Sequence, residues 1–316
     1  MSNNEALHVI FGTGPLGLAV MRELHRRGKR VRMVNRSGRR GAEMPAQIEL
    51  TAADAYNQEQ ARAVTQGAAV VYQCAQPAYH QWPEKFPPLQ TSILEAAAAN
   101  DARLIVAENL YMYGLVDGPI TEDLPFRAHT RKGQVRARMA EQLLEAHQRG
   151  HVRAASARGS DFYGPGVLNS ALGDRVFVPI LQGKKASAVG NLDLLHTYTY
   201  IDDFGKALVV LGEREEALGQ AWHVPNPPPL TTRALLTMAF QQVGHTPQMS
   251  GMSKLMMRIG GLFVMAARES VEMMYEFEHP FVVDHGKFAR AFGDHATPHD
   301  AALAQTLSWY KTHHAA

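Results

Sequence analysis

The sequence has little of several features that define whole classes of protein. Among its 316 residues there is a single cysteine, which excludes a disulfide within the chain and favours a reducing compartment. Its longest apolar run, residues 259–267, is too short to span a bilayer. The net charge is only +2, so no global charge favours nucleic acid or an anionic membrane. We therefore expect a cytoplasmic protein without membrane insertion or nucleic-acid binding.

What is present predicts an α/β fold. Short apolar strands alternate with helical segments, with strands expected at 7–11, 31–34, 47–50, 68–72, 103–107 and 152–157 and helices at 15–27, 89–100 and 132–149. This alternation is typical of a doubly wound parallel sheet of Rossmann type. We expect a dinucleotide-binding domain over residues 1–165, whose sheet is completed by part of 190–225. A smaller, mostly helical substrate region is expected over 166–316, mainly 225–300.

The expected substrate region is rich in methionine. Seven of the fourteen methionines lie between Met249 and Met274. Methionine adapts its shape readily, so this segment is either a pliable apolar surface over a substrate or a flexible core or dimer contact. Arg258, Arg268 and Glu269 interrupt the segment, which argues against membrane insertion.

A glycine motif stands directly between the first strand and the first helix. It reads Gly12-Thr13-Gly14-Pro15-Leu16-Gly17, a G-x-G-x-x-G pattern. In this place the first glycine permits a tight turn, the second lets the backbone approach a pyrophosphate, and the third allows close packing of helix and sheet. The helix N-terminus also favours phosphate. The motif predicts dinucleotide binding, although an ordinary strand–helix turn would look similar.

The end of the second strand selects the cofactor. NAD sites usually carry Asp or Glu about 20 residues after the glycines. Here the strand ends in Asn35-Arg36-Ser37, and no acidic residue follows until Glu43. A guanidinium and a hydroxyl suit a 2′-phosphate, so we expect NADP, with NAD as second choice. The competing interpretation is a solvated basic loop.

Two further strand ends complete the expected cofactor site. Asp54 follows the third strand, where its carboxylate could accept a hydrogen bond from an adenine amino group. The fourth strand ends in Cys74-Ala75-Gln76, small residues that would let a cofactor cross the strand tips. Cys74 has no histidine near it in sequence, which favours a small buried filler over a nucleophile. The histidines show no metal-ligand spacing, so no metal is expected.

Several further motifs occur in order along the chain. They are the segments 108–114 (ENLYMYG), 158–166 (RGSDFYGPG) and 200–203 (YIDD). Together with the glycine motif and Asp54, this set resembles the extended short-chain dehydrogenase/reductase superfamily of the NAD-dependent epimerase/dehydratase type. Tyr113-Gly114 is similar to its V-Y-G, and Gly164-Pro165 to its G-P. The resemblance covers nearly the whole chain and assigns Gly159 and Ser160 to the cofactor site.

The chain departs from that family where catalysis is expected. The family places Ser or Thr four residues before the V-Y-G tyrosine, and a Tyr-x-x-x-Lys pair on the next helix. Counting back from Tyr113 gives Asn109, and with Glu141 as the reference acid the Tyr and Lys positions fall on Gly133 and Ala137. The resemblance therefore implies an atypical member that lacks the usual proton donor.

Other residues are candidates for the missing roles. Lys132 could bind ribose hydroxyls, polarise a carbonyl oxygen or transfer a proton, while Arg and Lys on a long helix are usually solvated. Tyr111 could donate a proton, and Asn109 could hold a substrate oxygen. Arg131 and Arg136 could clamp a substrate anion. We expect Asn109, Tyr111 and Lys132 as the catalytic set, with Asn109 and Lys132 also touching the cofactor.

These residues predict an NADP-dependent oxidoreductase on a small apolar carbonyl or hydroxyl compound. Hydride transfer followed by its reversal would instead give an epimerase, and both readings stay open. The alternative is a non-catalytic NADP(H)-binding sensor or regulatory protein, because the usual Tyr and Lys are missing. The resemblance also implies a homodimer through helices 89–100 and 132–149.

Overall fold

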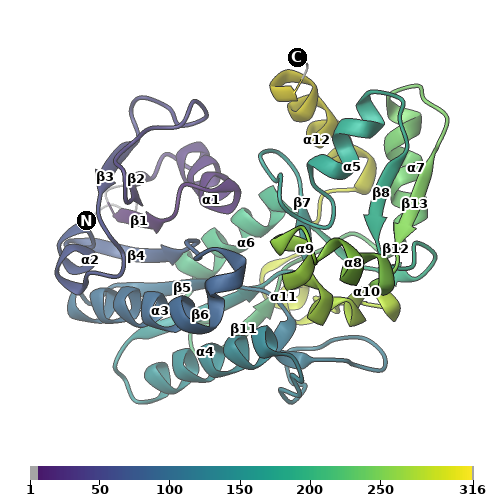
Figure 1. Ribbon diagram of the computed structural model, residues 1–316. Helices are drawn as coiled ribbons and strands as arrows, with labels where there is room; N and C mark the ends of the chain where they lie inside the picture. The colour runs from purple at the N-terminus through teal and green to yellow at the C-terminus, as the bar shows by residue number, and fades with distance from the viewer. Residues whose placement is uncertain (1–5, 315–316) are drawn as a thin grey trace. The chain divides into compact units, whose positions relative to one another are not determined.

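The computed structural model describes residues 6–314, which form two compact units that interleave along the chain (Figure 1). Unit 1 contains the chain up to Met112, Lys132–Arg158 and Phe204–Trp222. Unit 2 contains Tyr113–Arg131, Gly159–Asp203 and the chain from His223 onward. The sequence predicted a boundary near residue 165, with part of 190–225 completing the sheet of the first domain. The segment 204–222 belongs to unit 1, and residues 113–131 belong to unit 2.

Unit 1 is built on a seven-stranded sheet, as predicted for a doubly wound fold. The strand order is β11-β6-β5-β4-β1-β2-β3, and neighbouring strands from β3 to β6 pair in parallel. The bounds are β1 Leu7–Phe11, β2 Arg30–Asn35, β3 Glu49–Ala52, β4 Ala68–Gln73, β5 Arg103–Glu108, β6 Arg153–Arg158 and β11 Ala221–His223. The order reverses between β1 and β4, where doubly wound sheets bind ligands.

Helices cover both faces of this sheet (Figure 1). On one face lie α2, α3 and α4, which share an apolar core with the strands. On the other face α1 packs against α6 so closely that a Cβ on Gly205 would lie 2.7 Å from Ala19. The bounds are α1 Pro15–Arg26, α2 Gln58–Val64, α3 Trp82–Ala99, α4 Arg131–Gln148 and α6 Ile201–Glu213, with short 3-10 turns η1 Tyr79–Gln81, η2 Tyr111–Tyr113 and η3 Glu215–Ala217.

The start of α3 differs from the sequence prediction. The helix was expected from residue 89, but it begins at Trp82. Pro87 and Pro88 lie inside it, within its first two turns. Proline removes a backbone donor and usually ends a helix, which made this region look irregular in sequence. Both prolines lie beyond the first turn, so each removes a donor that the helix would otherwise use. The burial of Trp82 and Phe86 in the core offsets that cost.

Unit 2 combines helices with three two-stranded sheets, β10-β7, β12-β9 and β13-β8. Its main core is aromatic and aliphatic, with Tyr163, Phe177 and Tyr310 fully buried. The strand bounds are β7 Asp161–Tyr163, β8 Ala186–Val189, β9 Leu195–His196, β10 Tyr198–Tyr200, β12 Leu230–Thr231 and β13 Met249–Met252. The helix bounds are α5 Asp174–Leu181, α7 Thr232–Gln242, α8 Lys254–Gly260, α9 Met265–Ser270, η4 Val271–Met273, α10 Tyr275–Glu278, α11 Gly286–Phe292 and α12 His299–His314.

Candidate dinucleotide and catalytic site

The glycine loop connects β1 to α1 and requires glycine at two of its positions. Gly12 has φ +107°, and a Cβ there would lie 2.8 Å from the Ala75 backbone nitrogen. A Cβ on Gly17 would lie 2.0 Å from the Gly12 carbonyl oxygen. Side chains at either position would therefore push the loop away from β4 or from the first turn of α1.

The second glycine of the loop, Gly14, has free space around it. It caps α1 in an extended conformation, ahead of Pro15, and a Cβ there would meet no atom within 4 Å. Glycine is thus not needed for internal packing at this position. The free space lies at the N-terminus of a twelve-residue helix, whose first N–H groups favour an anion. The open space and the helix N-terminus together suit the pyrophosphate of a dinucleotide.

Asn35 at the end of β2 organises the neighbouring loop. Its Nδ2 donates to the Thr13 hydroxyl at 3.3 Å and to the Arg39 carbonyl at 3.0 Å. Its Oδ1 accepts from the Gly38 backbone nitrogen at 2.7 Å and from the Ser37 hydroxyl at 3.4 Å. One amide therefore holds the basic loop against the glycine loop. Glu or Asp would supply no Nδ2 donor for either contact.

Arg36 projects from this loop as a cation available to a ligand. Its side chain is exposed, and no ion pair within residues 6–314 involves it. Its charge acts on Tyr56, where it partly offsets the rise in pKa that burial and Asp54 cause. Arg40, by contrast, donates to the Pro45 and Ile48 carbonyls and stabilises the loop itself.

The other predicted cofactor residues lie at neighbouring strand ends of unit 1. Asp54 is exposed, and its carboxylate accepts from the Tyr56 backbone nitrogen at 3.1 Å. Cys74 is half-buried, and burial of its thiol raises the pKa of that group. A thiol of raised pKa suits a small packing residue and not a nucleophile. Ala75 lies against Gly12, and Gln76 is exposed. Their contact with a cofactor stays a prediction.

Asn109 and Tyr111 follow β5, and a third residue links them to Lys132. The Asn109 side-chain oxygen accepts from the Tyr111 backbone nitrogen at 3.3 Å. The Tyr79 hydroxyl donates to the Tyr111 hydroxyl at 3.3 Å, and the Lys132 Nζ lies 4.5 Å from the Tyr79 ring centroid. Lys132 is fully buried, so it does not belong to a solvated helix face. Unit 1 thus brings all three predicted catalytic residues together.

Tyr79 was missed by the sequence analysis. It lies in η1, between β4 and α3, and is 32 residues from Tyr111 along the chain. No spacing pattern connects the two hydroxyl groups. A signal was available only in the position of Tyr79 shortly after a strand end, where α/β sites form.

A buried charge cluster lies behind these residues. The Glu108 carboxylate is 3.0 Å from the Arg158 Nε and 3.8 Å from an Arg136 nitrogen, and all three side chains are almost fully buried. The Arg136 guanidinium also lies 4.8 Å from the Phe86 ring centroid. Burial lowers the pKa of Arg136, and Glu108 opposes that shift. Arg136 therefore already pairs with an internal carboxylate, and its contact with a substrate anion stays a prediction.

Two predicted cofactor residues belong to unit 2. Gly159 and Ser160 are buried at the start of the segment 158–166, which begins at the last residue of β6. The Ser160 hydroxyl donates to the Thr197 carbonyl at 2.5 Å, and its backbone nitrogen donates to the Thr199 hydroxyl at 2.9 Å. These bonds hold the loop to β10, and a cofactor contact from it stays a prediction.

Comparisons with known proteins agree with this geometry. The model of the NAD dependent epimerase/dehydratase family matches residues 9–224, well over half of the sequence. The chain belongs to this family. It is therefore related to epimerase/dehydratase-type enzymes that use a nicotinamide dinucleotide, as the motif set indicated. No curated protein matches the sequence.

Solved structures confirm the fold at low sequence identity. An epimerase from Methanothermobacter thermautotrophicus superposes with a TM-score of 0.82 at 15% identity, covering 99% of this chain and 94% of that one. A UDP-glucuronic acid 4-epimerase from Bacillus cereus, solved in complex with NAD, gives 0.77 at 16% identity and covers 97% of both chains. A dTDP-glucose 4,6-dehydratase from Streptomyces venezuelae with bound NAD gives 0.79 at 15% identity and covers 98% of both.

The described residues contain neither a membrane-spanning helix nor a cluster of metal-binding side chains. None of the described helices is both long and apolar enough to cross a bilayer. Within residues 6–314, no group of three or more His, Cys, Asp or Glu side chains is arranged to hold a metal ion.

Proposed function

We propose that this family member is an NADP-dependent oxidoreductase, of reductase, dehydrogenase or epimerase type, acting on a small apolar carbonyl or hydroxyl compound. The observation that carries the choice of cofactor is the end of β2. Asn35 stands there in place of an acid and anchors the loop, and Arg36 is exposed without an ion pair among the described residues. A 2′-phosphate suits such a guanidinium, whereas a ribose 2′-hydroxyl usually needs a carboxylate. NAD remains the second choice, since several structural neighbours were solved with it.

The residues that would hold the cofactor lie at one edge of the unit 1 sheet. The glycine loop would hold the pyrophosphate at the start of α1, and Arg36 and Ser37 would hold the 2′-phosphate. Asp54 would accept from the adenine, and the small residues at 74–76 leave the strand tips uncrowded. When bound, the nicotinamide ring supplies the hydride acceptor or donor.

The chain itself would manage the proton and the substrate oxygen. We assign proton donation to the Tyr111 hydroxyl, which already accepts a hydrogen bond from Tyr79. The positive charge of Lys132 beside the Tyr79 ring would favour negative charge on this pair of phenols. The Asn109 amide would orient the substrate oxygen, as amide donors do at developing oxyanions. The apolar character of the proposed substrate rests on the methionine-rich segment 249–274.

A non-catalytic NADP(H) sensor is the second candidate. Gly133 and Ala137 stand where the resemblance places the family's Tyr and Lys, and neither can transfer a proton. An intact glycine loop would fit both candidates equally. Turnover separates them, because a sensor binds NADPH without oxidising it in the presence of any carbonyl compound.

The test is a fluorescence titration with NADPH and with NADH on the wild type and on Arg36→Ala. We expect the wild type to prefer NADPH, and the variant to bind NADPH about tenfold to a hundredfold more weakly while binding NADH as before, because one charge-assisted contact is lost. Arg138→Ala removes an exposed arginine on α4 and should change neither titration. A wild type that prefers NADH, or a variant with unchanged NADPH affinity, would contradict the NADP assignment.

Turnover is measured separately on the same protein. NADPH oxidation with a panel of aliphatic and aromatic carbonyl compounds is expected in the wild type and greatly reduced in Tyr111→Phe. Tight NADPH binding with no turnover on any of them would favour the sensor. Full turnover by Tyr111→Phe would remove Tyr111 from the proposal and leave the cofactor assignment intact.

A further inference from the structure

The helical hairpin of α8 and α9, residues 254–270 in unit 2, exposes an unusual amount of apolar surface. Of the nine large apolar side chains that are strongly exposed within the described residues, seven belong to this hairpin. Phe263 is 86% exposed and Leu262 is 78% exposed. The seven are Leu255, Met256, Ile259, Leu262, Phe263, Val264 and Met265. Soluble surfaces rarely gather so many apolar side chains without a function.

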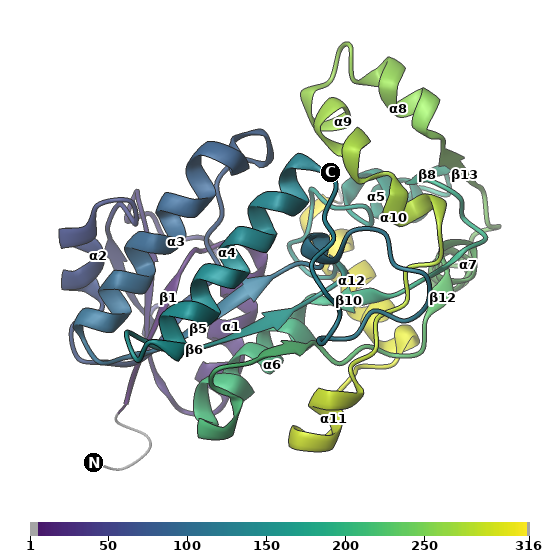
Figure 2. The same cartoon turned by 90° about the horizontal axis from the view of Figure 1, so that it is seen from below.

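The hairpin is well formed, so this exposure is not the result of an unfolded segment. Ser253 caps α8 through the Met256 backbone nitrogen, and the Val264 nitrogen donates to the Gly260 carbonyl at 2.8 Å across the turn. Met257 is buried against Val189 and Met274 and anchors the hairpin to unit 2. Figure 2 shows α8 and α9 extending from the β8–β13 side of this unit. The side opposite Met257 therefore faces outward.

Uncompensated positive charge accompanies the apolar side chains. Arg258 and Arg268 are exposed, and neither takes part in an ion pair between described residues. The nearby acids serve other partners, since Glu269 lies 3.8 Å from a guanidinium nitrogen of Arg131 and Glu272 accepts from the Arg131 backbone nitrogen. The exposed side of the hairpin thus combines large apolar side chains with two free cations.

We propose that this hairpin docks on an anionic lipid bilayer, with residues 262–265 at the boundary of headgroups and acyl chains and the two arginines among the phosphates. Interfacial helices need only one apolar face and flanking Lys or Arg, and binding strengthens with both. In this mode the hairpin lies at the surface of the bilayer, which agrees with the finding that none of the described helices is long and apolar enough to cross it. The arginines that made insertion look unfavourable in sequence would supply the headgroup contacts.

The charges also decide against a second copy of the chain as the occupant. In a symmetric dimer the same surface meets itself. Four arginines would then approach one another around an apolar contact with no free carboxylate on either hairpin. An anionic bilayer neutralises the same charges. The inference is independent of the proposed cofactor and proton-transfer residues, because it uses no residue of unit 1. Of the methionine-rich segment it uses only the outward side.

The experiment is vesicle flotation with the full-length protein. The probes are vesicles of phosphatidylcholine alone and of phosphatidylcholine with phosphatidylserine, each at low and high salt. We expect binding to the phosphatidylserine vesicles that weakens at high salt. The variant Leu262→Ser/Phe263→Ser should bind on the order of a hundredfold more weakly, since two apolar side chains lose their burial. Arg258→Gln/Arg268→Gln should lose about fivefold per arginine.

The matched control is Leu115→Ser, which removes an exposed apolar side chain elsewhere in unit 2 and should leave flotation unchanged. Thermal unfolding of each variant checks that the fold is retained, as expected for exposed positions. The proposal is overturned if the wild type does not float with the anionic vesicles, or if Leu262→Ser/Phe263→Ser floats equally well. It is also overturned if that variant changes the oligomeric state without changing flotation, because the hairpin would then be a protein contact.

Discussion

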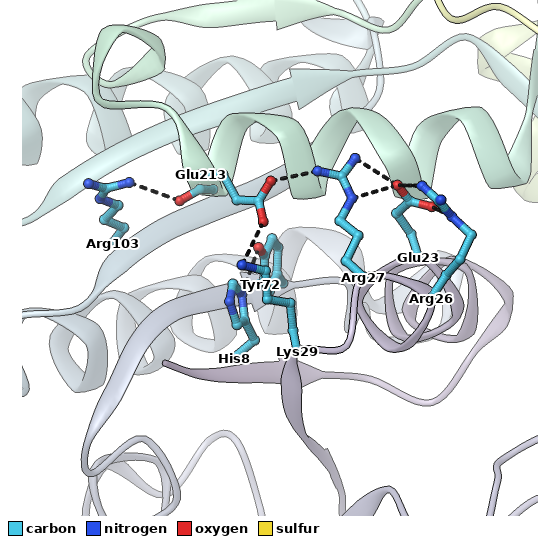
Figure 3. A network of polar contacts seen from close by, with 9 residues as sticks. His8, Glu23, Arg26, Arg27, Lys29, Tyr72, Arg103 and Glu213 are labelled. Atoms are coloured by element: carbon cyan, nitrogen blue, oxygen red, sulfur yellow. Dashed lines mark hydrogen bonds and ion pairs between the residues drawn. The ribbon is translucent and has the colours of Figure 1, made fainter. Parts of the chain in front are cut away.

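The buried histidine His8 predicts how the stability of unit 1 depends on pH. His8 in β1 is 3% exposed, and its Nδ1 lies 3.1 Å from the hydroxyl of Tyr72 (Figure 3). Burial lowers the pKa of His8 from 6.5 to about 4, and the nearby Glu213 carboxylate opposes that shift. Glu213 is itself held by ion pairs to Arg27 at 2.5 Å and Lys29 at 3.4 Å. The native state therefore holds His8 neutral.

The sign and size of the effect follow from these two pKa values. Below pH 6.5 the unfolded chain binds a proton at this histidine, while the folded protein does so only near pH 4. The contribution to stability is complete above pH 6.5 and is lost as the pH falls toward 4. Between pH 7 and pH 5 the free energy of unfolding should fall by about 2 kcal/mol from this residue alone.

The assay is urea denaturation at pH 7 and pH 5 for the wild type and for His8→Gln, which keeps a polar group for Tyr72 but does not titrate. Both proteins will lose stability at pH 5 through other groups, so the difference between them isolates His8. The wild type should lose about 2 kcal/mol more than the variant. His25→Gln, at an exposed position on α1, controls for the removal of an imidazole. An equal pH effect in wild type and His8→Gln would refute the reasoning.

Two further predictions concern the buried charges and the glycine loop. Glu108→Gln removes the carboxylate between two buried guanidinium groups and should lower the free energy of unfolding by about 3 kcal/mol, measured by urea denaturation. Glu215→Gln breaks an exposed ion pair and should cost less than about 1 kcal/mol in the same assay, so equal losses would contradict the argument. Gly17→Ala forces a Cβ against backbone and should destabilise the protein by about 1–3 kcal/mol. Gly14→Ala meets no atom, so it should leave the urea midpoint nearly unchanged while weakening NADPH binding in a titration, and unchanged binding would remove Gly14 from the site.

Most of the sheet could be predicted from sequence because its signals are local. Buried parallel strands appear as short apolar runs, and their alternation with helices predicts that they run parallel. The prediction failed where two local signals conflicted. The helix was expected from residue 89, directly after Pro87 and Pro88, although Trp82 and Phe86 already face the core from this helix. Proline acts on the backbone locally, while core packing depends on partners far away in sequence.

In the candidate site too, some residues could be proposed from local sequence signals and others could not. The glycine motif, Asn35 and Arg36 lie at strand ends, and strand ends are visible in sequence, so these positions could be proposed from sequence. The roles of Lys132 and Arg136 on α4 were not fixed by sequence, because composition alone makes them solvated. They stand four residues apart and so share one helix face, which turns inward. Arg138, two positions further on, is exposed.

The inward face of α4 is possible because unit 1 provides partners for both cations. Glu108, the last residue of β5, supplies the carboxylate that Arg136 needs, and the ring of Tyr79 covers the Lys132 ammonium. Glu108 lies 28 residues before Arg136, and Tyr79 lies 53 residues before Lys132. No sequence pattern links either pair. Burying a charge is costly unless it is compensated. Arg136 is compensated by an internal carboxylate, which leaves it little to offer a substrate. Lys132 lies instead beside the hydrogen-bonded phenols of Tyr79 and Tyr111, which makes it the cation of α4 best placed to serve the chemistry.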